Sequence, residues 1–209
     1  MAGPTPSNPI PLHQKTSHWF ERATAALLGE VPCRLGCTNC CIGPFPITLL
    51  DVQTLQQGLA GLPEDHRHRI EQRAIEHTTA MELTFPQLAH DHLLDNWSDQ
   101  EIDRLVTEFH HHPCPALEPD GHCGIYQHRP LVCRSMGIPT ESRGLAHGAC
   151  EVQTFIPIVR LPSSFREEED RLLQEETIAL DALRLATGSA GEEVFLPYGF
   201  LADRRPEGS

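Results

Sequence analysis

The chain has 209 residues, enough for one domain with a sizeable buried core. Its net charge of −13 argues against a nucleic-acid partner and against binding to an anionic membrane surface, because both require basic side chains. Hydrophobic residues make up 39% and aromatic residues only 6%, so we expect another interaction to help apolar burial hold the fold.

Residues 1–14 are rich in proline and lack the apolar segment of a secretory signal, so we expect a flexible tail there. No run approaches the roughly 18 apolar residues of a membrane span. We therefore expect a cytoplasmic protein without a membrane partner. In that compartment the eight cysteines favour metal binding over disulfides.

The first half of the chain predicts helices on both sides of a cysteine-rich stretch. Apolar spacing predicts a helix over 16–29, and the stretch 33–41 follows at once. A capping box at Thr48 begins the next helix, 63–81 has the pattern of a charged helix, and a second capping box at Ser98 begins another.

The second half predicts a long irregular segment and one long helix. Residues 114–150 are rich in Gly and Pro and lack helical periodicity, so we expect loops and turns held by ligands. One short strand is expected within 152–162. A third capping box, at Ser164, predicts the start of an acidic helix that ends near Gly188.

These elements predict a mainly α fold with little or no sheet. We expect a single globular domain over 15–188, with helices packed around a loop-rich, cysteine-containing metal-binding region at 30–150. Residues 189–209 are expected to form an irregular C-terminal tail.

The stretch CRLGCTNCC carries four cysteines in nine residues, which is not the pattern of buried structural thiols. Cys33, Cys37 and Cys40 are spaced so that their sulfurs share one face of a helical turn or curl round one centre. Soft thiolates favour zinc, iron–sulfur clusters or Cu(I). The side chains of adjacent residues diverge. Cys40 and Cys41 are therefore expected either to ligate two neighbouring metal centres, or to provide one ligand and one thiol that lies beside the ligands.

Four more cysteines, Cys114, Cys123, Cys133 and Cys150, follow downstream. Four plus four ligands fill two tetrahedral sites, or one polynuclear cluster with ligands to spare. The radical-SAM spacing of the first three cysteines is the weaker interpretation, because the chain lacks a repeating βα pattern and a Gly-rich binding segment. We expect the two cysteine groups to meet in space.

The first cysteine group followed by CP, DGHCGIY and RPLVCR resembles the YkgJ-type cysteine-cluster family. That family is also called the CxxCxxCC or zinc/iron-chelating domain family, and its members are described as candidate iron–sulfur proteins. The resemblance covers roughly residues 30–150. It implies that all eight cysteines are metal ligands: Cys33, Cys37, Cys40, Cys41, Cys114, Cys123, Cys133 and Cys150.

Basic side chains near the cysteines are candidates for tuning the centre. Arginines offset thiolate charge, and the family pattern favours this role for Arg129 and Arg134. Arg34 and Arg143 are equally consistent with surface residues. We interpret the tract His110–His112 as the C-terminal end of a helix, where histidine rings interact favourably with the helix dipole. This interpretation is preferred to a set of metal ligands. Two histidines inside the cysteine segment are candidates for contact with the ligands: His122 and His128.

No Ser/His/Asp arrangement, P-loop or dinucleotide fingerprint occurs in the sequence. The leading hypothesis is a cytoplasmic iron–sulfur protein with an electron-transfer or redox role. The alternative is a structural zinc protein whose braced surface binds another protein. A third hypothesis is an enzyme that uses an exposed iron, although the sequence specifies no reaction or substrate.

Overall fold

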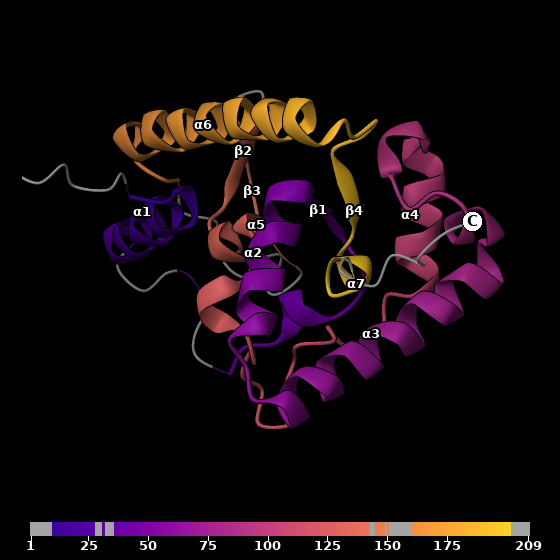
Figure 1. Cartoon of the computed structure of the whole chain (residues 1–209). Helices are drawn as coiled ribbons and strands as arrows, with labels where there is room; N and C mark the ends of the chain where they lie inside the picture. The colour runs from indigo at the N-terminus through magenta and orange to yellow at the C-terminus, as the bar shows by residue number, and fades with distance from the viewer. Residues whose placement is uncertain are drawn as a thin grey trace, which may run out of the picture.

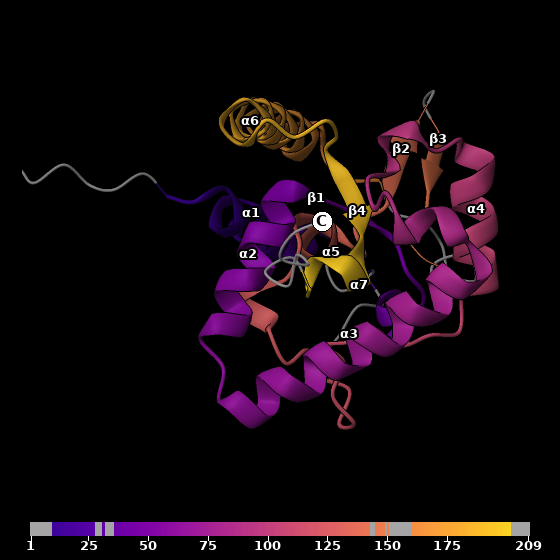
Figure 2. The ribbon, with the colours of Figure 1, turned by 45° about the vertical axis from the view of Figure 1, so that its right-hand side comes forward.

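The computed structural model describes residues 10–27, 31, 36–142, 145–148, 150 and 160–201. Helices dominate this part of the chain, and the only sheets within it are two antiparallel pairs of short strands. The predicted mainly α fold is confirmed. Helix α6 lies across one side of the molecule, and α3 runs along the opposite edge (Figures 1 and 2).

Helix α1 spans Leu12–Ala26 and begins earlier than the sequence predicted. Pro11 has φ −59°, and its carbonyl accepts hydrogen bonds from the backbone N–H groups of the first turn. A proline at this position therefore fixes the start of the helix. The apolar side of α1 packs against residues from three other parts of the chain. Together they form a small core: Trp19, Ala23, Leu27, Val31, Ile138 and Leu161.

Two of the three predicted capping boxes are confirmed. Thr48 begins α2 (Leu49–Ala60) and Ser98 begins α4 (Asp99–Glu108), each with reciprocal side-chain bonds to the third helical residue. The box predicted at Ser164 is wrong, because α6 (Ser163–Thr187) begins one residue earlier, after a proline, without a side-chain cap. It ends as predicted at Gly188, whose φ of 67° suits glycine.

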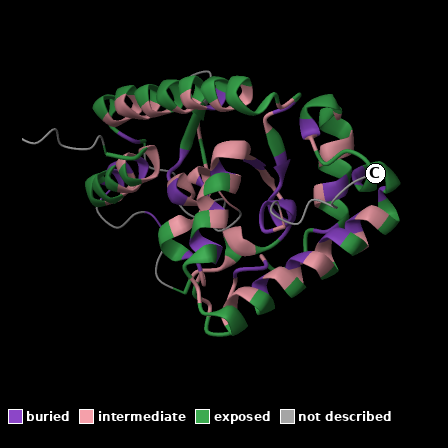
Figure 3. Ribbon diagram, in the orientation of Figure 1, coloured by how far each residue is buried: buried purple, intermediate pink, exposed green. Residues whose placement is uncertain are grey.

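The main core lies between α2, α3 (Glu64–Thr84), α4 and the C-terminal segment. Short 3₁₀ turns, η2 (Pro86–Ala89) and η3 (Leu94–Asn96), connect α3 to α4. The outer sides of α3 and α6 are largely exposed (Figure 3). Large buried side chains in this core are Ile47, Leu55, Leu59, Ile70, Met81, Leu88, Leu105, Phe195, Leu196 and Phe200.

The predicted irregular C-terminal tail is wrong for residues 193–201. Glu193–Phe195 form β4, which pairs antiparallel with β1 (Pro46–Thr48), and Leu196–Gly199 form the short helix α7. Phe195 is completely buried. The segment is structured because its apolar side chains complete the main core.

Residues 114–150 contain more regular structure than predicted. The turn η4 (Tyr126–His128) precedes the short helix α5 (Leu131–Ser135), and β2 (Thr140–Ser142) pairs with β3 (Leu145–His147). The strand predicted within 152–162 falls largely outside the described residues. No helix in the described ranges is long and apolar enough to cross a membrane.

Candidate metal centre

The backbone joins the two cysteine groups directly. Cys40 and Cys41 lie on the 3₁₀ turn η1 (Asn39–Cys41), after which the chain becomes extended. Ile42 then forms an antiparallel bridge with Pro113, and the N–H of Cys114 donates to the carbonyl of Cys41 at 2.7 Å. The two groups are thus joined here through the backbones of Cys41 and Cys114, while the predicted meeting of Cys33 and Cys37 with the downstream cysteines stays a prediction.

A tight turn carries the chain from Cys114 to Cys123. Leu117 and Cys123 form an isolated antiparallel bridge, and the N–H of Gly124 donates to the carbonyl of Ala116 at 2.8 Å. This turn also lies against the upstream cysteine loop, because a Cβ on Gly121 would be 3.5 Å from the side chain of Thr38. Gly121 has φ 83°, a conformation that favours glycine.

Helix α3 holds this turn from outside. Arg73 donates to the carbonyl of Leu117 at 2.6 Å and to the carboxylate of Glu118 at 2.9 Å. His66 contacts the same carboxylate at 3.1 Å. Sequence reasoning missed this brace, because its members come from separate segments and match no short motif.

Two buried charged residues position α5, which carries Cys133. Asp51 completes the capping box of α2 and also accepts a hydrogen bond from the N–H of Leu131 at 2.7 Å. Arg134 is 2% exposed and donates to the carbonyls of Arg129 and Gln127 and to the hydroxyl of Ser17. Arg134 therefore acts first as a brace for α5, in addition to the predicted placement of its charge near a thiol.

Five cysteines are connected by electrostatic interactions, each with at least one other member of the group. We call Cys40, Cys41, Cys114, Cys123 and Cys133 the five-thiol cluster. Within the described residues no three His, Cys, Asp or Glu side chains are arranged to hold a metal ion. The five-thiol cluster is therefore defined by proximity and not by ligating geometry.

Burial and mutual repulsion govern the ionisation of the five-thiol cluster. Burial raises the pKa of Cys114 to about 12 and also raises the pKa of Cys123. Burial raises the pKa of Cys133 well above its ordinary value, and negative charge on Cys114, Cys123 and Cys40 adds to the effect. Several thiolates in this space would therefore repel one another unless a cation neutralised them.

The vicinal pair behaves as one coupled unit. A hydrogen bond from Cys41 lowers the pKa of Cys40 to about 6, while the same bond and burial raise the pKa of Cys41. The guanidinium of Arg129 also favours the Cys40 thiolate, and it lies 3.9 Å from the ring centroid of Tyr126. Arg129 is thus placed to offset negative charge, as its position beside the cysteines predicted.

Three predicted ligands are not part of the five-thiol cluster as described: Cys33, Cys37 and Cys150. Cys33 lies outside the described residues, as do Arg34 and Arg143. Cys37 and Cys150 are free thiols, and no described hydrogen bond connects either of them to the cluster. The assignment of all eight cysteines as ligands stays a prediction.

The tract His110–His112 follows the C-terminal end of α4, where the sequence placed it. The ring of His110 contacts the carbonyl of Thr107 at 2.7 Å, in the last turn of α4, which suits a helix C-terminus. His122 interacts with Asp120 at 3.2 Å. His128 lies against Gly58 of α2. Their predicted contact with cysteine ligands is not among the described hydrogen bonds.

One family model matches the chain. It covers residues 32–151, more than half of the chain and all eight cysteines, and describes CxxCxxCC, a putative zinc- or iron-chelating domain. The comparison with curated proteins and the comparison with solved structures each gave no match. The matched range coincides with the segments that build the five-thiol cluster.

Proposed function

The chain belongs to the CxxCxxCC family of zinc- or iron-chelating domains, and we propose that its five-thiol cluster binds an iron–sulfur centre with a redox role. The observation that carries this proposal is the convergence of five thiols from three separate segments. No two of the downstream cysteines have the C-x2-C spacing of a zinc knuckle, so the donor set favours a cluster over a pair of zinc ribbons.

The residues fit such a group in their chemistry. Thiolates are the ligands that iron–sulfur clusters take, usually four at a time. Cys114, Cys123 and Cys133 would supply three of them, and one of Cys40 and Cys41 the fourth. When bound, the cluster supplies one-electron transfer. The protein's own contribution is to hold the thiols together, limit their contact with water, and place the positive charge of Arg129 nearby.

A structural zinc ion is the second candidate function. The family description names zinc as well as iron, and Cys37 and Cys40 have the spacing of a zinc knuckle. In that case the metal would stabilise the loops that α3 and Arg134 already contact, and the stabilised surface would bind a protein partner.

Anaerobic purification followed by metal and acid-labile sulfide analysis separates the two. We expect a coloured protein with iron and sulfide in equal amounts, and loss of both in Cys133→Ser. A colourless protein with zinc and no sulfide would assign the scaffold role instead. Thr140→Ser, a change of similar size on the exposed hairpin, is the control and should retain the metal.

A further inference from the structure

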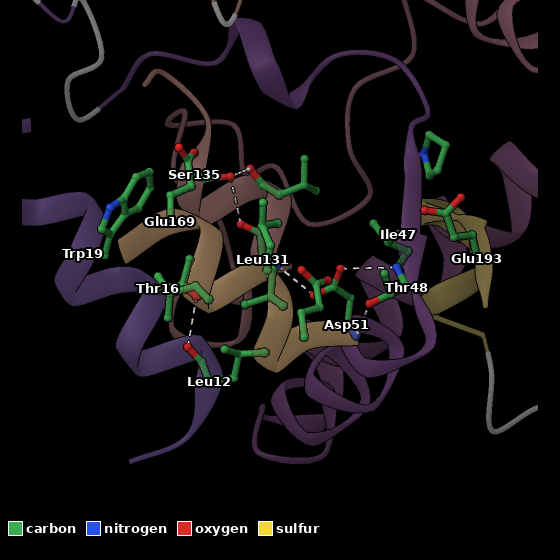
Figure 4. Close-up of a pocket in the computed structure, with 15 residues that line it drawn as sticks. Leu12, Thr16, Trp19, Ile47, Thr48, Asp51, Leu131, Ser135, Glu169 and Glu193 are labelled. Carbon is green, nitrogen blue, oxygen red and sulfur yellow. Dashed lines mark hydrogen bonds between the residues drawn. The ribbon is translucent and has the colours of Figure 1, made fainter. Parts of the chain in front are cut away.

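A cavity of about 310 Å³ lies between α1, α6 and the start of α5. Its volume is at the lower end of the range for small-molecule sites. Leu12, Thr16 and Trp19 line it from α1, and Figure 4 shows them facing Leu131 and Asp51 across the space. Cys133, although on α5, is not among the lining residues.

The walls of the cavity are mainly apolar, and helical spacing explains why. Leu12, Thr16 and Trp19 recur at intervals of four and three residues on one side of α1. On α6 the adjacent residues Leu172 and Leu173 lie one turn from Glu169 on one side and from Glu176 on the other, and Leu173 is partly exposed at the mouth of the cavity. Two helices therefore present aliphatic surface to the same partly open cavity.

The polar part of the lining is acidic. The described lining residues include four carboxylates and no Lys, Arg or His. Glu169 is paired with Arg166 at 2.6 Å, and Asp51 accepts two backbone N–H bonds. Glu176 and Glu193 form no ion pair with any residue in the described part of the chain. The cavity therefore contains two carboxylates whose charge is not neutralised by a described neighbour.

The ionisation of these two groups agrees with this geometry. Burial raises the pKa of Glu176 to about 7, and the charges of Asp51 and Glu193 add to the shift. Burial also raises the pKa of Glu193, with further contributions from Asp95 and Glu192. A cation placed between Glu176 and Glu193 would favour the ionised form of both.

We propose that this cavity binds a small organic cation, a primary ammonium group on a short aliphatic body. The ammonium pairs with Glu176 and Glu193, and the body lies against Leu172, Leu173 and Trp19. A divalent metal ion fits less well, because calcium and magnesium take shells of oxygen ligands and water, whereas most of this lining is hydrocarbon. The site does not depend on which metal the five-thiol cluster holds.

The test uses full-length, metal-loaded protein and n-hexylamine as the probe. The chain has two tryptophans, so Trp97→Phe leaves Trp19 as the fluorescent reporter inside the cavity. At about pH 8, where Glu176 is ionised, we expect a saturable change in Trp19 emission with n-hexylamine. We expect n-hexanol, which has the same body without the charge, to bind about tenfold more weakly or worse.

Variants assign the effect to the cavity. Glu176→Gln should weaken n-hexylamine binding about tenfold, whereas Glu167→Gln, an exposed change of the same kind on α6, should leave it unchanged. Both variants should keep the wild-type metal content, which distinguishes this site from the proposed metal centre. Equal binding of n-hexanol and n-hexylamine, an unresponsive Trp19, or full affinity in Glu176→Gln would overturn the proposal.

Discussion

Replacing Arg134 tests whether a buried cation holds the helix that carries Cys133. The residue is 2% exposed, and its guanidinium donates to the carbonyls of Arg129 at 2.9 Å and Gln127 at 2.5 Å and to the Ser17 hydroxyl at 2.6 Å. Arg134→Met leaves these acceptors without a donor. A hydrogen bond from a charged donor contributes ~1.5–3 kcal/mol, and the three are not additive, so we expect a loss of about 3 kcal/mol.

Arg134→Lys separates shape from charge. Lysine keeps the positive charge but lacks the planar fork that reaches three acceptors, so we expect it to recover less than about half of the loss. Arg171→Met, an exposed change on α6, is the control and should stay within ~0.5 kcal/mol of wild type. The assay is urea denaturation followed by circular dichroism at equal metal content. Wild-type stability in Arg134→Met, or full recovery in Arg134→Lys, would refute the bracing role.

Four further predictions concern separate features of the fold. Gly121→Ala should lower the free energy of unfolding by about 1 kcal/mol, because φ is 83° there; an unchanged thermal midpoint would contradict this. Ser98→Ala should cost about 1 kcal/mol through its capping box, measured by urea denaturation, with exposed Ser164→Ala, which caps nothing, as the control. Glu176, with its pKa raised to about 7, binds a proton more tightly in the folded state, so its contribution to stability falls as pH rises from about 4.5 through 7. Glu176→Gln should therefore stabilise the protein by about 1 kcal/mol at pH 8 and have no such effect below pH 4.5, after discounting for solvent screening; equal stability at pH 8 would disprove this. Removing the metal with a chelator should increase amide hydrogen exchange across 114–133 while α6 stays protected, and unchanged exchange in 114–133 would count against a metal that orders these loops.

The sequence predicted local features well, because their signals lie within a few residues. The capping boxes at Thr48 and Ser98 each depend on side chains three residues apart. The box at Ser164 failed because Pro162 already fixes the start of α6. A neighbouring proline can thus replace a side-chain cap, and the capping pattern alone does not reveal which of them begins the helix.

Features that depend on distant partners were not predictable in the same way. Residues 193–195 form a strand because Pro46–Thr48 and Leu93 pair with them, and no pattern near these segments specifies the pairing. The bond from Leu131 to Asp51 joins α5 to α2, and Arg73 of α3 holds Leu117. These braces are single side chains reaching backbone groups of another segment.

The candidate site was predictable from the sequence only in part. Counting ligands predicted that the two cysteine groups meet, and the backbone bond from Cys114 to Cys41 brings the two segments side by side. Spacing alone did not identify which thiols come together. Cys133 reaches Cys114 and Cys123 because α5 is placed by Asp51 and Arg134, and neither role is visible in the motif.

The most direct test of the central claim is X-ray absorption at the iron edge of anaerobically purified protein. An iron–sulfur centre in the five-thiol cluster predicts a first shell made of sulfur only, together with iron–iron scattering in the wild type, and loss of the iron signal in Cys133→Ser. A first shell of oxygen and nitrogen, or a protein with zinc in a four-sulfur shell at about 2.3 Å and no iron, would contradict it.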